Sequence, residues 1–211
     1  MKKIIFIGIC MLLISCGKKE VLLPQISETV VADVKDHSPI YMFLKIEKND
    51  TLLELNRKSS IVSTNWLFNI DKRLPLRLVV PQIQDLQFRK ESSEHKNAAA
   101  DNYFTYMDSK KKTLAFLPFT GVTYKMEKPT TDFKVIYFLK NGKVKINNQE
   151  IEKSKLELFL NELPIEKETE LSIAYDKNLS FGDYISSRFM AKMISIKTLG
   201  LSMNFKTEFI Y

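Results

Sequence analysis

The sequence predicts an α+β protein in which two units of the order β-β-α-β-α-β follow a cleaved N-terminal leader. Two observations support this prediction. One is an apolar run at the start of the chain, and the other is a set of hairpin and helix-cap signals that recur in both halves. The chain has 211 residues and is 45% hydrophobic. That length and composition suit one or two compact domains.

The first sixteen residues predict a lipoprotein signal peptide. Lys2 and Lys3 form a basic start, and residues 4–14 are an uncharged, largely apolar run. Such a run is too short to span a bilayer, which takes about 20 residues, but it suits a secretory signal. The run closes on a motif that resembles the lipobox of bacterial lipoproteins: Leu13, Ile14, Ser15 and Cys16.

Lipidation would make Cys16 the anchored first residue of the mature chain, with residues 1–15 removed. Cys10 would leave with the leader, so no free thiol, disulfide or cysteine metal ligand is expected. The alternative is an ordinary cleaved signal beside a chance cysteine. No aspartate follows Cys16, which favours the periplasmic face of the outer membrane over the inner membrane or the cell surface. Residues 16–38 show no sustained hydrophobic period and are expected to form a tether.

The C-terminal unit, residues 133–211, opens with a predicted hairpin. Strands are expected at 133–139 and 143–146, joined through Asn141 and Gly142. This dipeptide is typical of a type I′ turn, in which both central residues have positive φ.

Two helices complete the C-terminal unit. Ser154 and Glu157 fit a capping box that opens the first helix, and Pro164 ends it. Residues 180–183 cap the second helix, whose expected buried residues are Tyr184, Ile185, Phe189 and Met193. Strands are expected before and after this second helix, at 171–175 and 201–211.

The N-terminal unit, residues 39–120, is predicted to repeat this order, and residues 121–132 are the expected linker. The tripeptide Phe-Leu-Lys at 43–45 recurs at 138–140. Residues 132–211 would then fold alone, as a monomer or a dimer. The alternative is one irregular α+β domain of about 170 residues. The expected N-terminal elements are strands at 40–47 and 52–55, a helix at 59–71, a strand at 76–80, a helical stretch within 82–100 and a strand at 113–119.

The C-terminal unit resembles the periplasmic domain of the ExbD/TolR family. The resemblance covers residues 139–147, 152–163 and 174–184, and the N-terminal unit resembles a diverged copy. The matching features are the Asn141-Gly142 turn, a second turn at Asn147 and Asn148, a leucine-rich helix, and Asp176-Lys177 before a helix that begins near Phe181.

This resemblance implies a domain that dimerises and contacts peptidoglycan or an extended segment of a partner protein. ExbD and TolR proteins begin with a transmembrane helix that carries an ionisable aspartate, and such a buried charge is retained for function. The apolar run at 4–14 has no Asp or Glu. Proton-driven motor activity is therefore not implied for this chain.

The composition excludes several classes of enzyme. Only four glycines lie beyond residue 17, and they are far apart, which excludes a glycine-rich phosphate loop, a dinucleotide fingerprint and a nucleophile elbow. Two histidines and two cysteines make a metal site of three such ligands hard to assemble. No catalytic residue, metal or cofactor is therefore expected.

Two pairs of titratable residues are candidate chemical groups. His37 and His95 lie in polar stretches and are expected to be solvated loop residues rather than ligands or bases. Asp176 and Asp183 flank the start of the last helix and could form an acid pair. Capping and helix-dipole roles explain both aspartates better.

Two further clusters are candidate binding surfaces. Lys110, Lys111 and Lys112 could meet an anionic glycan or lipid head group, although a solvated turn is the favoured interpretation. Nucleic-acid binding would need a broader basic face with aromatic platforms. The remaining cluster could stack on a sugar, but burial against a sheet is favoured; its members are Tyr103, Phe104 and Tyr106.

The leading functional hypothesis is a non-enzymatic, lipid-anchored periplasmic binding or scaffold protein, accessory to an ExbD/TolR-type envelope transport or energy-coupling system. An edge strand could supply recognition, because an extended peptide can pair with its free N–H and C=O groups. The alternative is an envelope lipoprotein that binds peptidoglycan or another glycan without a motor partner. An envelope hydrolase is disfavoured because no convergent acid, base and nucleophile are visible.

Overall fold

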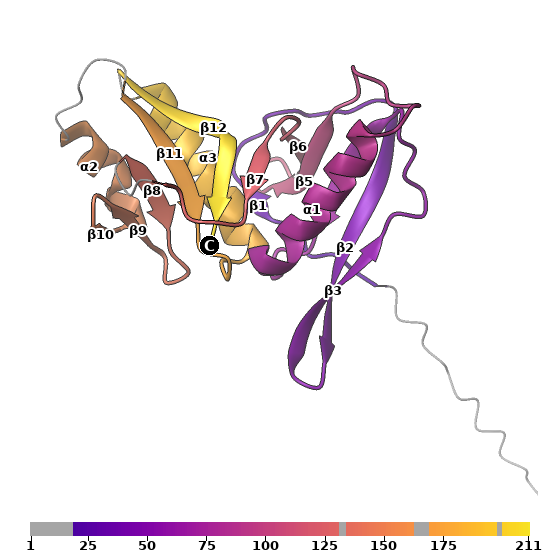
Figure 1. The fold of residues 1–211 in the computed structure, drawn as a ribbon, viewed down its shortest axis with the longest axis horizontal. Helices are drawn as coiled ribbons and strands as arrows, with labels where there is room; N and C mark the ends of the chain where they lie inside the picture. The colour runs from indigo at the N-terminus through magenta and orange to yellow at the C-terminus, as the bar shows by residue number, and fades with distance from the viewer. Residues whose placement is uncertain (1–18, 131–133, 163–168, 198–199) are drawn as a thin grey trace, which may run out of the picture.

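The computed structural model describes residues 19–130, 134–162, 169–197 and 200–211 (Figure 1). Within them the protein is a mixed α+β fold with two six-stranded sheets and three α-helices. The predicted α+β class is therefore confirmed at this coarse level. The leader with Cys16 and the predicted helix stop at Pro164 lie outside the described residues.

The N-terminal sheet has the strand order β1-β5-β4-β2-β3, and the sixth strand, β6, also pairs with β5. The helix α1, Leu76–Glu91, connects β4 to β5. The strands are β1 Gln25–Ile26, β2 His37–Glu47, β3 Asp50–Asn56, β4 Asn65–Ile70, β5 Asn102–Asp108 and β6 Thr113–Pro118.

The C-terminal sheet has the order β10-β9-β8-β11-β12-β7. The helix α3, Phe181–Lys197, connects β11 to β12, and α2, Leu156–Glu162, precedes β11 after a short 3-10 turn at Lys153–Lys155. The strands are β7 Thr123–Lys125, β8 Val135–Phe138, β9 Lys143–Ile146, β10 Gln149–Glu152, β11 Thr169–Tyr175 and β12 Leu201–Ile210.

The two sheets contain the same four-strand arrangement. In each, an antiparallel hairpin is followed by two parallel strands, giving the orders β3-β2-β4-β5 and β9-β8-β11-β12. In each, the crossover between the two parallel strands carries a long helix, α1 or α3.

Two predictions for the N-terminal unit are wrong. The segment expected as a helix at 59–71 contains β4, in which Trp66, Phe68 and Ile70 are buried together on the core side. The segment expected as a strand at 76–80 opens α1, which continues through Pro81 to Glu91. The buried residues of α1 recur at helical spacing, namely Leu76, Val79, Val80, Ile83 and Leu86.

The order of the N-terminal unit also differs from its prediction. The segment between β3 and β4, residues 57–64, contains no helix, whereas α2 occupies the matching place in the C-terminal unit. The strand predicted at 113–119 is present as β6, but it is antiparallel to β5. The unpredicted strand β5 takes the parallel position beside β4.

The C-terminal elements follow the predicted order, with β10 added after the hairpin. The predicted type I′ turn is wrong, because only Gly142 of the dipeptide has a positive φ, at 82°. The amide N–H of Gly142 donates to Leu139 O at 3.2 Å, so a three-residue loop ending in a left-handed glycine closes the hairpin. The helix α2 begins at Leu156, so Ser154 lies inside the preceding 3-10 turn and does not open the helix.

Type I′ geometry occurs instead at two other hairpins. Lys48 and Asn49 join β2 to β3 with φ of 47° and 71°, and Asn147 and Asn148 join β9 to β10 with φ of 46° and 66°. Asparagine tolerates the left-handed region better than most residues. The predicted turn at Asn147 and Asn148 is therefore present.

The segment expected as a tether is packed against the N-terminal sheet from Leu22 onward. Lys72 N donates to Leu22 O at 2.7 Å, β1 pairs with β5, and Val31 bridges to Phe116. Part of the expected linker is also structural, because β7 is an edge strand of the C-terminal sheet.

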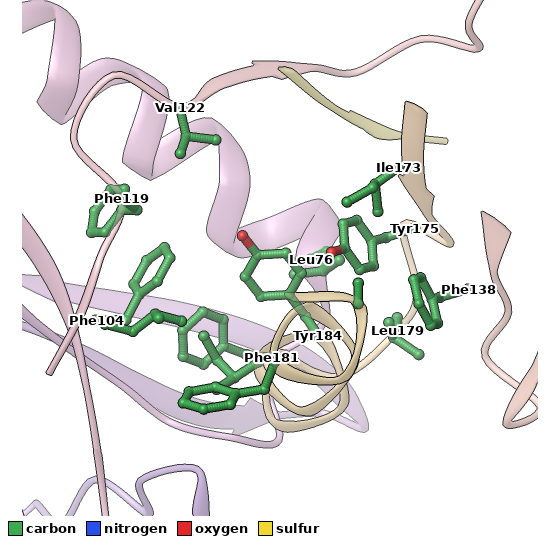
Figure 2. Packing of buried hydrophobic residues seen from close by; sticks show 14 of the residues in the cluster. Leu76, Phe104, Phe119, Val122, Phe138, Ile173, Tyr175, Leu179, Phe181 and Tyr184 are labelled. Carbon is green, nitrogen blue, oxygen red and sulfur yellow. The ribbon is translucent and has the colours of Figure 1, made fainter. Parts of the chain in front are cut away.

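One hydrophobic core joins the two sheets. Figure 2 shows Phe104 and Phe119 from the N-terminal side facing Phe181 and Tyr184 of α3, with further apolar side chains of the C-terminal sheet beyond. The Phe104 ring stacks on Phe119 at 3.8 Å and meets Phe181 edge-on at 5.3 Å. Burial of these rings in common therefore ties the two halves together.

Candidate binding site

The two halves meet at a pair of matching hexapeptides, residues 71–76 and 176–181, which together form the junction. Each hexapeptide leads from a strand into its crossover helix. In each, the aspartate carboxylate accepts the backbone N–H two residues later, at 3.0 Å from Arg73 and 2.8 Å from Asn178. The hexapeptides are Asp-Lys-Arg-Leu-Pro-Leu at 71–76 and Asp-Lys-Asn-Leu-Ser-Phe at 176–181. This recurrence is a sequence signal that could have located the junction.

The hexapeptides exchange backbone hydrogen bonds reciprocally, as in an approximate two-fold arrangement. An antiparallel bridge between Pro75 and Ser180 lies at its centre. These bonds occupy N–H groups at both helix N-termini, which are therefore not free to bind an anion. The N–H to O distances are 3.0 Å for Leu76 to Leu179, 2.8 Å for Phe181 to Leu74, 2.7 Å for Arg77 to Lys177 and 2.9 Å for Gly182 to Lys72.

The junction also sets the correspondence between the units. Asp71 N donates to Met42 O at 3.0 Å, and Asp176 N donates to Phe138 O at 2.9 Å. Met42 therefore corresponds to Phe138, and the repeated Phe-Leu-Lys tripeptide is one residue out of register. A shift of one residue places side chains on opposite faces of a sheet, so the tripeptide match has no structural counterpart.

A buried ion pair lies on the C-terminal side of the shared core. Arg188 Nε donates to Glu208 Oε1 at 2.7 Å, and Tyr184 Oη donates to Glu208 Oε2 at 2.7 Å. The hydroxyl groups of Tyr124 and Tyr184 are 3.2 Å apart. Burial, the largest single influence, lowers the pKa of Arg188, but the Glu208 carboxylate and the surrounding tyrosines together outweigh it and raise that pKa. Burial raises the pKa of Tyr184. The cluster links α3, β12 and β7, and its four side chains are all buried.

A second buried cation lies near the end of α1. Lys90 Nζ donates to Asn102 Oδ1 at 3.0 Å and lies 4.9 Å from the centre of the Trp66 ring. Burial lowers the pKa of Lys90 to about 8. These contacts stabilise the helix against β4 and β5, and the lysine is only 4% exposed.

The histidines and aspartates considered from the sequence do not come together into one site. His37 is exposed, with Nδ1 2.6 Å from Val34 O, but it is the first residue of β2 and not a loop residue as predicted. His95 lies in an exposed turn. Asp183 caps α3 reciprocally with Ser180, as predicted, because Ser180 Oγ donates to its carboxylate and accepts its N–H. Asp176 stabilises the turn of the junction.

The other two predicted clusters have structural roles in β5 and in the turn that follows it. Lys110 and Lys111 donate their backbone N–H groups to Asp108 in the β5–β6 turn. Tyr103 is half-buried, whereas Phe104 and Tyr106 are fully buried. Tyr106 Oη also donates to Glu28 O at 2.9 Å, so it holds the N-terminal segment in place.

The strongest candidate for binding is a groove between the junction and the β2–β3 hairpin. It has a volume of about 480 Å³. Leu44, Ile46 and Thr51 form the hairpin side, and Pro75 belongs to the opposite wall. Three cationic side chains and one carboxylate complete the charged part of the lining: Arg73, Arg77, Lys140 and Asp183.

The cations of this groove differ in their partners. Arg73 donates to the buried carboxylate of Asp71 at 2.7 and 2.9 Å, which neutralises the charge of Arg73 locally. The Arg73 side chain remains exposed. Arg77 and Lys140 are exposed and take part in none of the ion pairs found among the described residues. The groove therefore has two cations available for a ligand beside an apolar wall.

Strand β3 borders this groove and has no strand on its outer side within the described residues. The two-residue loop makes Glu47 and Asp50 a hydrogen-bonded pair, so alternate residues of β3 point their N–H and C=O groups outward. These residues are Thr51, Leu53 and Leu55. The outer edge of β7 is partly covered by α1. Gln84 donates to Tyr124 O of β7 at 2.9 Å, and Gln87 donates to Val122 O just before the strand at 3.1 Å.

A second, smaller cavity of about 270 Å³ lies on the outer face of the C-terminal sheet. The rings of Tyr137 and Tyr211 stack there at 4.5 Å, and burial raises the pKa of Tyr137 to about 12. Lys145 and the left-handed residues Asn147 and Asn148 supply polar groups.

Two features are absent from the described part of the chain. No group of three His, Cys, Asp or Glu side chains is placed to hold a metal ion there. No helix in the same part is both long and apolar enough to cross a membrane. Comparisons with protein-family models, curated proteins and solved structures found no match to this chain.

Proposed function

We propose that the protein is a non-enzymatic, lipid-anchored binding protein of the cell envelope that holds an extended, acidic segment of a partner protein. The segment would pair with the free edge of β3 and place its carboxylates against Arg77 and Lys140. The observation that carries the proposal is the coincidence of an uncovered edge strand with a groove that has unpaired cations. Main-chain pairing supplies affinity in this mode, and the groove supplies specificity.

The resemblance to the ExbD/TolR family suggests what the partner does. Two ExbD/TolR-like units in one chain would reproduce, within a monomer, the dimer that this family forms between chains. The reciprocal hydrogen bonds at residues 71–76 and 176–181 support this interpretation. The protein would act as an accessory to an envelope transport or energy-coupling system, anchored through Cys16 at the periplasmic face of the outer membrane.

Photo-crosslinking in cells tests this function. A photoreactive amino acid at Thr51 or Leu55 should capture one envelope protein through an acidic, extended segment, and the same group at Phe88 of α1 should not. Charge reversal by Arg77→Glu with Lys140→Glu should abolish the crosslink without changing the melting temperature, because both side chains are exposed. A crosslink that survives charge reversal would remove the groove from the proposal.

Thr51→Pro provides a sharper test of edge pairing. Proline removes an N–H that faces outward, so the β2–β3 ladder should keep its hydrogen bonds while the partner loses one. Thr51→Val is the matched control, because it keeps the N–H and the branched shape. Equal capture by the two variants would contradict pairing along β3.

The second candidate function, glycan binding without a motor partner, is favoured by the cavity beside Tyr137 and Tyr211. Aromatic faces with nearby amides suit a sugar ring. Sedimentation with purified peptidoglycan sacculi tests it: binding that is lost in Asn147→Ala with Lys145→Ala would support the glycan function, and no binding by the intact chain would exclude it.

A further inference from the structure

The first described residue, Lys19, contacts β3. Lys19 forms an ion pair with Glu54 of that strand, and Leu22 N donates to Asp71 Oδ2 at 3.3 Å. Lys19 is only three residues beyond Cys16 in the sequence. Three extended residues span at most about 10 Å, and the six residues to Leu22 span about 20 Å. A lipid on Cys16 would therefore hold β3 close to the bilayer surface.

The same strand belongs to a ribbon that projects from the molecule. Strand β2 pairs with β4 only as far as Met42, whereas its pairing with β3 continues to Glu47 and Asp50. Residues 43–54 therefore form a two-stranded ribbon that extends beyond the N-terminal sheet (Figure 1).

The tip of the ribbon, residues 45–52, exposes large apolar side chains. Ile46 is 63% exposed and Leu52 is 39% exposed. Lys45 and Lys48 are balanced nearby by Glu47 and Asp50, and Lys45 is itself paired with Glu47. These charges cancel at the tip, which exposes one large apolar side chain on each face of the ribbon, because Ile46 pairs with Thr51 and Leu52 pairs with Lys45.

We infer that the tip of the β2–β3 ribbon rests in the interface of the bilayer to which the chain is anchored. The inference rests on the proposed lipidation of Cys16. The short distance between the anchor and Glu54 selects the lipid surface over other occupants of the tip. Apolar residues at such a surface bury themselves at the boundary between head groups and acyl chains. The groove would then lie close to the membrane, where a segment emerging from an envelope protein could reach it.

Single-cysteine labelling of the mature lipoprotein tests this placement. Residues 17–211 contain no cysteine, and a lipidated Cys16 has its sulfur blocked as a thioether. Ile46→Cys and Leu52→Cys can therefore each carry one environment-sensitive fluorophore. The labelled chains are reconstituted in vesicles of phosphatidylethanolamine and phosphatidylglycerol, with or without brominated acyl chains. Phe88→Cys and Ile196→Cys are controls, because these residues are 71% and 70% exposed on α1 and α3.

Brominated lipid should quench the labels at 46 and 52 by about twofold and leave the labels at 88 and 196 unchanged, because bromine in the acyl chains acts only at the interface or deeper. Two substitutions on opposite strands guard against a local effect of either one. If all four labels respond equally while the chain floats with the vesicles, the placement is wrong. If the chain does not float and mass spectrometry finds Cys16 without lipid, the anchor fails and the placement fails with it. A ribbon tip shielded in cells but unquenched in vesicles would assign the tip to a protein partner and overturn the inference.

Discussion

The two units share a strand arrangement and a junction motif, but they bury different chemistry at corresponding positions. Counting from the matched strand ends, Phe104 of β5 corresponds to Glu208 of β12, because they pair with Phe68 and Ile173 respectively. The N-terminal unit places a phenylalanine stack there, and the C-terminal unit places a carboxylate paired with Arg188. The same backbone arrangement therefore tolerates an apolar or an ionic interior, provided that the charge has a partner.

Each crossover helix also buries one cation, and the two cations differ in their partners. Arg188 of α3 has a carboxylate partner, whereas Lys90 of α1 has an amide, a carbonyl and an aromatic ring. A neutral acceptor offsets less of the cost of burying charge than a carboxylate does. Burial is the largest influence on both groups; Glu208 and the nearby tyrosines overcome it and raise the pKa of Arg188, whereas it prevails at Lys90 and lowers that pKa.

Separating the units should have the largest effect. Residues 132–211 alone would lack β7 and would expose Phe181 and Tyr184, which pack against Phe104 in the whole chain. We now expect this fragment to melt without cooperativity as a monomer, contrary to the expectation from its local signals. Calorimetry and sedimentation of residues 132–211 and 121–211 would measure this. A sharp monomeric transition for the shorter fragment would show that the units are energetically independent.

Breaking the ion pair should be the largest effect of a single substitution. Arg188→Met leaves Glu208 buried without its cation and should destabilise the protein by about 3–5 kcal/mol. The double variant Arg188→Met with Glu208→Leu should recover most of this loss, because it makes the C-terminal interior apolar like its counterpart. Urea denaturation measures both. A double variant as unstable as the single one would mean that the carboxylate also supports the tyrosine cluster.

Lys90 should make stability depend on pH. Its pKa is about 8 in the folded chain and 10.5 ordinarily, so the unfolded chain binds more protons between these values. Stability therefore rises with pH across this window, by roughly 2 kcal/mol between pH 8 and pH 10. Lys90→Met should flatten this rise, and Lys96→Met, on an exposed lysine, should leave it in place. An unchanged slope in Lys90→Met, measured by urea denaturation across the same pH range, would assign the dependence to other groups.

The smallest effect should distinguish the two helix starts. Ser180 caps α3 with its hydroxyl, whereas Pro75 at the corresponding place in α1 makes no side-chain cap. Ser180→Ala should therefore cost about 1 kcal/mol, and Ser180→Thr much less. Pro75→Ala should cost only about 0.5 kcal/mol, through the greater freedom of the unfolded chain. Thermal melts of the three variants would rank them, and equal losses for Ser180→Ala and Pro75→Ala would contradict the capping role.

The sequence alone determined the elements whose signals are local. The cap formed by Ser180 and Asp183 follows from two side chains that bond within three residues of each other, and the turn at Asn147 and Asn148 follows from the tolerance of asparagine for the left-handed region. Such interactions form in much the same way whatever surrounds them. The scarcity of glycine, histidine and cysteine likewise limited the possible sites before any fold was known.

Only the tertiary structure decided the elements whose environment is remote. Segment 65–70 became a strand because both of its faces are covered, which hides the alternation that a half-buried strand would show. Segment 76–80 became helix because its apolar residues face a core supplied by both sheets.

The junction, the Glu208–Arg188 pair and the groove beside β3 likewise join residues from distant parts of the chain. Their energies depend on neighbours that local propensity cannot contain. The sequence predicts recognition at a sheet edge, and the choice of β3 for the proposed site depends on how the two halves are arranged.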